Sequence, residues 1–285
     1  MSEEYLIPNS ITEALQMLDG KRRPIAGGTD LMVARRTGDL GATSFVDVTQ
    51  IPELQKLELE EDRLLVGAGC RFSDLEVLLR EKVPGLAEAC HQVGSPLIRN
   101  LATLGGNLVS ASPAADTVPP LAAFGATVEI VSLQKRREIP VAQLAIGPKQ
   151  TQLASGELVT RIMVPIRKSN EGQAFLKLGR RRAMAISIVN GAARVLLEGR
   201  TIKEASLAIG SAAPCVIVSR SVPEILIGKE LHDDLLSGLG SAVASEVKPI
   251  SDLRASADYR REMCGLLARR LIILAYQRAL KGGKS

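Results

Sequence analysis

Aromatic residues are scarce in this chain of 285 residues, which has no tryptophan, three tyrosines and four phenylalanines. Proteins that hold single-stranded nucleic acid usually stack bases on aromatic side chains interleaved with basic ones. The net charge of +5 and the basic clusters at 21–23, 135–137 and 180–182 would suit a polyanion, but no cluster falls in a recognisable binding motif. We therefore expect no nucleic-acid partner and interpret the clusters as solvated faces or as docking surfaces for acidic partner subunits.

Cysteine and histidine are also few. The chain has four cysteines without a C-x-x-C pair and two histidines: Cys70, Cys90, Cys215, Cys264, His91 and His232. This spacing lacks the usual zinc and iron–sulfur motifs, so no metal site is expected. Cys90 and His91 are adjacent and would face apart on a helix or strand. We therefore predict no catalytic side chain.

Long apolar runs are missing too. A helix that spans a bilayer needs about 18 or more consecutive apolar residues, and the chain opens with an acidic segment rather than with a charged and then apolar signal. We expect no membrane span, reduced thiols and a cytoplasmic location. The length lies where single cores begin to divide into domains, so two or three units are expected.

Two glycine pairs stand out among the 25 glycines of the chain. Residues 25–32 read Ile-Ala-Gly-Gly-Thr-Asp-Leu-Met, and residues 103–108 read Thr-Leu-Gly-Gly-Asn-Leu. Such corners can point backbone N–H groups outward and let the backbone approach a ligand closely, which favours phosphate. Together they predict an anion cradle suited to a diphosphate, formed by both loops. Ordinary turns are the alternative interpretation.

Local patterns predict the elements around these corners. Ser10 and Glu13 form a capping box before a short helix, and Ser73 caps another. Residues 23–26 form a strand into the first glycine pair, after which Thr29 or Asp30 begins a helix that ends at Gly38, with the Asp30 carboxylate as its cap.

The rest of the chain alternates between strands and helices. Hairpins are expected at 57–68 and 128–141, and a strand at 158–164. A polar linker at 167–172 separates them from strands at 185–190, 192–197 and 206–210 and from a last helix over 256–280. Strands followed by helices indicate an α+β fold.

Five motifs follow one another in an informative order. They are Ala-Gly-Gly-Thr-Asp-Leu at 26–31, Ile-Arg-Asn-Leu-Ala-Thr-Leu-Gly-Gly-Asn-Leu at 98–108, Ser-Pro-Ala-Ala-Asp at 112–116, Lys-Leu-Gly-Arg-Arg at 177–181 and Ser-Ala-Asp-Tyr-Arg-Arg at 256–261. This order resembles the FAD-binding, or medium, subunit of the molybdenum hydroxylases. That family includes flavin subunits or domains of xanthine dehydrogenases, carbon monoxide dehydrogenases and related enzymes that oxidise aldehydes and N-heterocycles. The resemblance covers essentially the whole chain.

The resemblance implies which residues would bind FAD. The cofactor diphosphate would be wrapped by Ile25, Ala26, Gly27, Gly28, Thr29, Asp30, Leu31 and Met32, and Thr103, Gly105, Gly106 and Asn107 would lie beside the same cofactor. Asp116 would lie near the polar groups of the flavin, and Lys177 would approach the isoalloxazine. Val159 falls where the family often has a leucine against the flavin or adenine. A cation at Lys177 would favour the reduced flavin. A solvated lysine and a capping aspartate are the alternatives.

The resemblance also implies a fold and partners. The fold would be a two-lobed FAD-binding domain of the vanillyl-alcohol-oxidase/PCMH type, with lobes at 1–54 and 55–168, followed by a smaller α+β C-terminal domain at 172–285. The chain would take electrons from a [2Fe-2S] small subunit, next to a molybdopterin-containing large subunit, and pass them to NAD⁺ or another acceptor.

Such a complex would be a heterotrimer, and its substrate is predicted to be xanthine on family frequency alone. Carbon monoxide, aldehydes and N-heterocycles are the alternatives within the family. Outside it, the chain would be a stand-alone FAD-dependent NAD(P)H oxidoreductase or a nonenzymatic nucleotide-binding protein.

Overall fold

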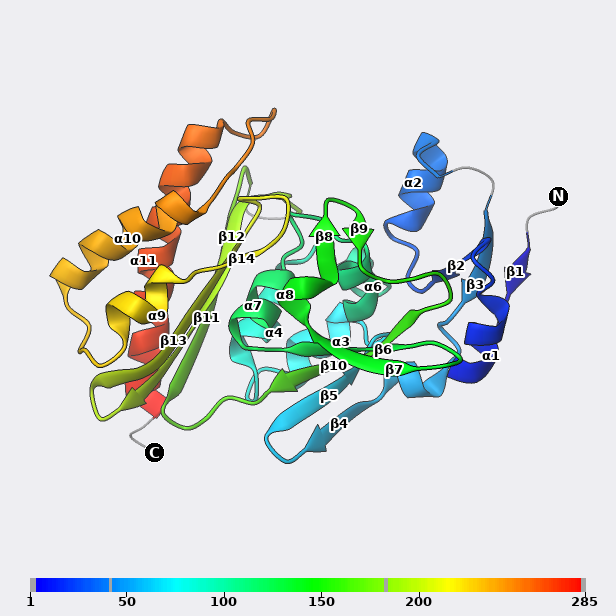
Figure 1. The fold of residues 1–285 in the computed structure, drawn as a ribbon, viewed down its shortest axis with the longest axis horizontal. Coiled ribbons are helices and arrows are strands. Elements are labelled where there is room, and N and C mark those ends of the chain that lie inside the picture. Colours follow the sequence, from blue (N-terminus) through cyan, green and yellow to red (C-terminus); the bar gives the residue numbers. More distant parts are fainter. Residues whose placement is uncertain (1–3, 41–42, 182–183, 283–285) are drawn as a thin grey trace.

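Three main sheets follow one another along the chain and define three successive units (Figure 1). The structure is a computed structural model that describes residues 4–40, 43–181 and 184–282. Arg182, in the third basic cluster, lies outside the described residues. Each unit combines a sheet with helices, which confirms the predicted α+β class. We propose 1–54, 55–168 and 172–285 as the corresponding domains.

The first unit is a small parallel sheet with strand order β1-β3-β2. Its elements are β1 (Tyr5–Leu6), α1 (Ile11–Met17), β2 (Arg22–Ile25), α2 (Leu31–Thr37), β3 (Ser44–Asp47) and the 3-10 helix η1 (Pro52–Gln55). Ser10 caps α1 as predicted, with its Oγ accepting from the Glu13 N–H at 3.2 Å. The Glu13 carboxylate accepts instead from the Asn9 N–H at 2.8 Å, so the capping box is incomplete. Helix α2 has no buried residue and projects from the body of the molecule (Figure 1).

The second unit is an antiparallel sheet with order β4-β5-β10-β6-β7, packed against short helices. Its elements are β4 (Leu57–Glu60), β5 (Arg63–Gly67), α3 (Phe72–Leu78), α4 (Pro84–Gln92), α5 (Pro96–Arg99), α6 (Leu104–Val109), α7 (Val118–Ala123), β6 (Thr127–Val131), β7 (Arg136–Pro140), α8 (Val141–Leu144), β8 (Ala145–Gly147), β9 (Gln150–Thr151) and β10 (Leu158–Pro165). Alternate residues of β5 and β6 are buried, which is why both predicted hairpins form. Ser73 does not cap α3: the helix begins at Phe72, whose side chain is fully buried.

The third unit is an antiparallel sheet with order β11-β12-β13-β14. Its elements are β11 (Glu171–Gly179), β12 (Ser187–Glu198), β13 (Thr201–Gly210), β14 (Ile217–Val218), α9 (Ser221–Leu226), α10 (Asp233–Glu246) and α11 (Ala257–Gly282). The last helix is close to its predicted bounds. The strands predicted at 185–190 and 192–197 are one strand, because β12 continues through Gly191. The linker predicted at 167–172 is shorter, since β11 begins at Glu171.

The third sheet packs against helices of two units. Helix α11 of its own unit packs on β11 and β12, and the helices α4 and α7 of the second unit also pack on this sheet. Glu88 on α4 joins the two units directly. One of its carboxylate oxygens accepts from the backbone N–H of Phe175 at 3.1 Å, and the other pairs with the Arg278 guanidinium at 2.6 Å. The backbone of strand β11, at the edge of its sheet, is therefore held by a side chain of the second unit.

Glu157 secures the segment that precedes β10. Its carboxylate pairs with the Arg137 guanidinium at 2.8 Å and with the Lys135 ammonium at 3.5 Å, and accepts from the Ala154 N–H at 2.9 Å. The hydrogen bond from Arg137 is the main cause that lowers the pKa of Glu157 to about 2. This segment packs on the first unit, where Leu158 belongs to the same core cluster as Leu15 of α1.

Acid should weaken this attachment. Because the folded pKa of Glu157 lies below the ordinary value of 4.5, its contribution to the free energy of unfolding is complete above pH 4.5 and is lost as the pH falls towards 2. We expect Glu157→Gln to lower the unfolding free energy at pH 7 and to flatten its decline between pH 4.5 and 2, measured by urea unfolding. Glu198→Gln, at an exposed pair with Lys203, is the matched control. Identical acid profiles for wild type and Glu157→Gln would contradict this assignment.

None of the helices in the described ranges is long and apolar enough to cross a membrane.

Candidate functional site

The first glycine pair forms the loop between β2 and α2, and it lies directly against the second unit. A Cβ at Gly27 would overlap the carbonyl oxygen of Leu101 and come within 2.9 Å of the Ala102 nitrogen. Gly28 has a φ of +67°, in the left-handed region that favours glycine. The two glycines thus serve different purposes: Gly27 allows the close approach of two backbones, and Gly28 makes the turn into α2.

The backbone N–H groups of this loop are free for a ligand. Among the described residues, none accepts a hydrogen bond from the N–H groups of Gly27, Gly28, Thr29, Asp30 or Leu31. Regular helical bonding begins one residue later, with the Met32 N–H donating to the Gly28 carbonyl at 2.9 Å. Successive unpaired N–H groups at a turn make an anion-binding concavity. The loop at 27–31 therefore has the donor set that a diphosphate requires.

Asp30 does not cap α2 with its side chain, contrary to the prediction. Its backbone has φ −97° and ψ −44°, a helical conformation rather than the extended one that lets a side chain fold back onto the first turn. The carboxylate instead accepts a hydrogen bond from the Ser110 Oγ at 2.7 Å. Asp30 thus ties the first glycine loop to the end of α6 in the second unit.

The second glycine pair lies inside the first turn of α6, and the prediction that it also presents free N–H groups is wrong. The Gly105 N–H donates to the Ala68 carbonyl at 2.8 Å, and the Gly106 N–H to the Thr103 Oγ1 at 3.1 Å. Gly105 allows α6 to pack closely, since a Cβ there would lie 2.5 Å from the Ala68 Cβ. The amide cradle therefore comes from the first loop alone.

Residues of α6 still offer a surface to a ligand. Gly106 is exposed and Asn107 is half-buried, while Thr103 is buried as the N-cap. The Asn107 Oδ1 accepts from the Thr117 Oγ1 at 2.6 Å. The Asn107 Nδ2 has no acceptor among the described residues, so the side chain keeps a donor for a bound molecule.

Asp116 and Lys177 form a buried ion pair between the second and third units. Asp116 is 7% exposed and the Lys177 side chain 8%. The Lys177 Nζ lies 2.5 Å from the Asp116 Oδ2 and also donates to the Gln92 carbonyl at 3.2 Å. The sequence left two alternatives open, a solvated lysine and a capping aspartate. Both are wrong: the Lys177 side chain is buried, and Asp116 does not cap α7.

A series of side-chain contacts connects the predicted residues, and we call this series the line of contacts. Asp30 contacts Ser110, the C-cap residue of α6, and Asn107 lies about one helical turn earlier, within α6. Asn107 contacts Thr117, whose neighbour Asp116 pairs with Lys177. The line of contacts runs from the free N–H groups of the first loop, over α6, to a charged pair at the third unit. Its ends suit the two ends of an elongated ligand, one anionic and one with polar ring atoms.

Val159 is the remaining residue predicted for the site. It lies on β10 next to the register shift between Val159 and Arg161, and is buried in the core of the second unit. This core cluster also contains Leu104 and Leu108 of α6, and α6 packs on β10, so Val159 lies on the core side of that helix. Its place in the site stays a prediction.

Sequence reasoning missed two residues that touch Asp116. Ser187 Oγ and Asn190 Nδ2 donate to the Asp116 Oδ1 at 2.6 Å and 2.8 Å, and both residues are fully buried on β12. The available signal was their polarity within the mostly apolar run at 187–193, because buried polar groups need partners.

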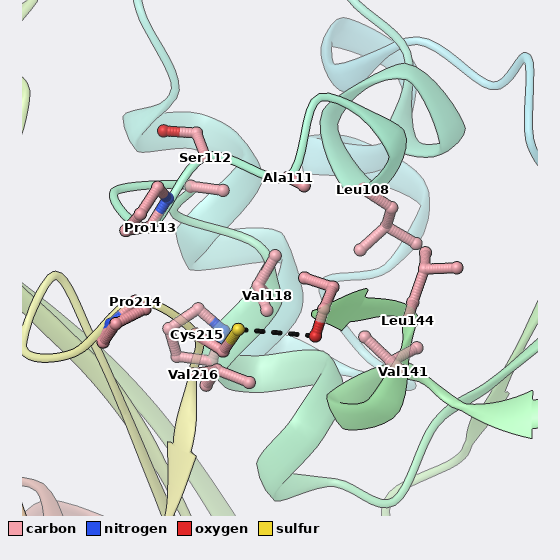
Figure 2. A pocket seen from close by; sticks show the side chains of 14 residues that line it. Leu108, Ala111, Ser112, Pro113, Val118, Val141, Leu144, Pro214, Cys215 and Val216 are labelled. Carbon is pink, nitrogen blue, oxygen red and sulfur yellow. Dashed lines mark hydrogen bonds between the residues drawn. The ribbon is translucent and has the colours of Figure 1, made fainter. Parts of the chain in front are cut away.

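A small apolar pocket lies beside the Ser112–Asp116 segment, between the second and third units (Figure 2). Leu108, Val118, Val141 and Leu144 face it, together with Cys215, whose Sγ donates to the Ala145 carbonyl at 3.4 Å. Burial raises the pKa of the Cys215 thiol, which makes it a weaker nucleophile. Within the described ranges, no group of three or more His, Cys, Asp or Glu side chains is arranged to hold a metal ion.

Comparison with known proteins gives matches along the whole chain. Residues 1–167 match the family model described as the FAD binding domain in molybdopterin dehydrogenase, and residues 174–275 match that of the CO dehydrogenase flavoprotein C-terminal domain. The chain is 32% identical over 267 residues to the glyceraldehyde dehydrogenase medium chain of Sulfolobus acidocaldarius, covering 92% of this chain and 94% of that protein. It is 28% identical over 281 residues to the xanthine dehydrogenase FAD-binding subunit of Escherichia coli O157:H7, covering 96% of each.

The fold also matches a solved structure. A chain of carbon monoxide dehydrogenase from Hydrogenophaga pseudoflava superimposes with a TM-score of 0.93 over 98% of both chains, at 26% sequence identity. The agreement confirms the predicted succession of a two-lobed N-terminal domain and a smaller C-terminal α+β domain.

Proposed function

Because the chain belongs to the FAD-binding subunits of the molybdenum hydroxylases, and is thus an oxidoreductase subunit with FAD as its cofactor, we propose that it transfers electrons from an iron–sulfur subunit to NAD⁺ or another acceptor. FAD supplies the redox chemistry when bound. The chain binds and orients the cofactor and sets the electrostatic potential around it.

The five free N–H groups at 27–31 carry the proposal of where the cofactor binds. They would hold the diphosphate, and the Asp30 carboxylate, held by Ser110, would stay engaged beside them. Thr103, Gly105, Gly106 and Asn107 of the α6 region would lie along the cofactor, and Asp116 and Lys177 at its flavin end. The flanking residues Ile25, Ala26, Leu31 and Met32 complete the first segment, and Val159 is the remaining proposed contact.

We propose two partner subunits, a molybdopterin-containing large chain and a [2Fe-2S] small chain, in a heterotrimer. The names of the similar proteins support this, since they are a medium chain and an FAD-binding subunit. A purified chain that oxidises purines or aldehydes by itself would contradict it.

The substrate of the complex would bind to another chain. The similar proteins are named for glyceraldehyde, xanthine and carbon monoxide, three chemically different substrates. Xanthine therefore stays a prediction, beside aldehydes, carbon monoxide and N-heterocycles.

The visible absorption spectrum of the purified chain tests the proposal, with the chromophore identified after denaturation. We expect flavin bands and released FAD. A colourless protein that does not take up added FAD would favour the nonenzymatic nucleotide-binding alternative. Steady oxidation of NAD(P)H by the isolated chain with a diffusible acceptor would favour the stand-alone oxidoreductase.

A further inference from the structure

Two buried side chains of β12 hold one oxygen of a carboxylate that belongs to another unit. The Ser187 Oγ and the Asn190 Nδ2 donate to the Asp116 Oδ1 at 2.6 Å and 2.8 Å, while the Lys177 Nζ lies 2.5 Å from the Asp116 Oδ2. The two oxygens of Asp116 thus have separate partners. Neutral donors bind Oδ1, and the cation binds Oδ2.

Two hydrogen-bond acceptors orient the side-chain amide of Asn190. Its Nδ2 faces two acceptors, the Ala115 carbonyl at 3.2 Å and the Asp116 Oδ1. Its Oδ1 is buried without a hydrogen-bond partner among the described residues, and it occupies the space that a Cβ at residue 210 would fill, where the chain has Gly210. A buried, unpaired carbonyl is destabilising. The Asn190 amide is therefore oriented by the two bonds of its Nδ2, to Ala115 and to Asp116.

We propose that Ser187 and Asn190 are positioning residues of the flavin site. They fix the Asp116 carboxylate so that its second oxygen meets Lys177, and the positive ends of their dipoles offset part of its charge. This rests on the proposed function, since it requires that Asp116 and Lys177 face the flavin end of bound FAD.

The expected effects have a definite sign. Without one donor, the Asp116 carboxylate is less well placed for Lys177, and its negative charge is less offset. Each loss makes the surroundings of the cofactor more negative, which disfavours the reduced flavin. Removing the carboxylate itself acts in the opposite direction. The donors therefore act through Asp116, which is what distinguishes them from residues that only stabilise the fold.

The test compares Ser187→Ala and Asn190→Leu with wild type in the full-length chain. We expect the flavin midpoint potential to become more negative in each variant. FAD binding should weaken by less than the about tenfold that the loss of a hydrogen bond to a charged group would give, because the lost bond is to Asp116 and not to FAD. Ser206→Ala, on the neighbouring strand β13, is the matched control, because the Ser206 hydroxyl has no hydrogen-bond partner among the described residues. It should leave both quantities unchanged.

A double-mutant cycle completes the test. In an Asp116→Asn background, the effect of Ser187→Ala on the potential should largely vanish, because the hydroxyl then faces an uncharged group. An unchanged potential in Ser187→Ala, or the same shift with and without the Asp116 carboxylate, would overturn the inference. Ser187→Ala removes a single oxygen, so it remains informative if Asn190→Leu fails to fold. Wild-type protein that binds no FAD would instead overturn the proposed function, and this inference with it.

Discussion

Gly27→Ala is expected to weaken FAD binding by about tenfold to a hundredfold. The added Cβ would overlap the Leu101 carbonyl, and the nearest atoms all belong to the Leu101–Ala102 backbone, so no flexible side chain can give way. Overpacking of this kind costs about 1–3 kcal/mol or more, and it is relieved only by moving the loop away from the second unit. That movement would displace the five N–H groups proposed to hold the diphosphate. Quenching of FAD fluorescence on titration with apoprotein measures the loss.

Gly238→Ala is the control for this variant. Gly238 lies inside α10 with no heavy atom near the position of a new Cβ, so alanine should leave FAD binding unchanged and stabilise the helix by up to about 1 kcal/mol. If Gly27→Ala bound FAD as tightly as wild type while remaining folded, the first glycine loop would not be the diphosphate site.

Elements with a strong local pattern could be predicted from the sequence. The hairpins of the second unit and helix α11 follow from alternation and from a long apolar stripe. Strand β11 was missed because its polar residues have distant partners: Glu171 pairs with Arg194, and Lys177 with Asp116. Judged from their sequence neighbours alone, these charged residues suggest solvent-exposed positions. Their burial is a tertiary effect that no short window contains.

The candidate site, too, has a part that the sequence predicts and a part that depends on tertiary contacts. The order of the motifs was sufficient to nominate the glycine loops, Asp116 and Lys177. It did not show that only the first loop has free N–H groups, because this depends on Ala68, which accepts from Gly105 across the fold.

The role of Arg260 also depends on contacts that are distant in the sequence. It lies in the Ser-Ala-Asp-Tyr-Arg-Arg motif and is almost fully buried, donating to the Ile188 carbonyl at 2.7 Å and pairing with Asp252 at 2.7 Å. It holds the beginning of β12, next to Ser187. The motif therefore supports the strand that presents Ser187 and Asn190, a role that its sequence could not reveal.

Lys177→Met is expected to make the flavin midpoint potential more negative by tens of millivolts. The ammonium lies 2.5 Å from Asp116, so its removal leaves a buried carboxylate uncompensated beside the proposed flavin end of the site. A negative charge there opposes the addition of electrons to the cofactor. For a two-electron couple, about 30 mV corresponds to 1.4 kcal/mol, and a charge a few ångströms away interacts by a few kcal/mol at an effective dielectric constant of about 20. Spectroscopic titration against a reference dye measures the shift.

The ion pair also predicts what should reverse this shift. Asp116→Asn leaves Lys177 without its anion and should raise the potential, and the double variant Lys177→Met with Asp116→Asn should return it towards the wild-type value, because both charges are then absent. Loss of one partner of a buried pair also destabilises a protein by about 3–5 kcal/mol, but the potential reports only on folded protein with FAD bound. Lys203→Met, at an exposed pair with Glu198, should change neither quantity. Equal potentials in Lys177→Met, Asp116→Asn and wild type would place the flavin away from this pair, and FAD would then have to extend from the first glycine loop in another direction.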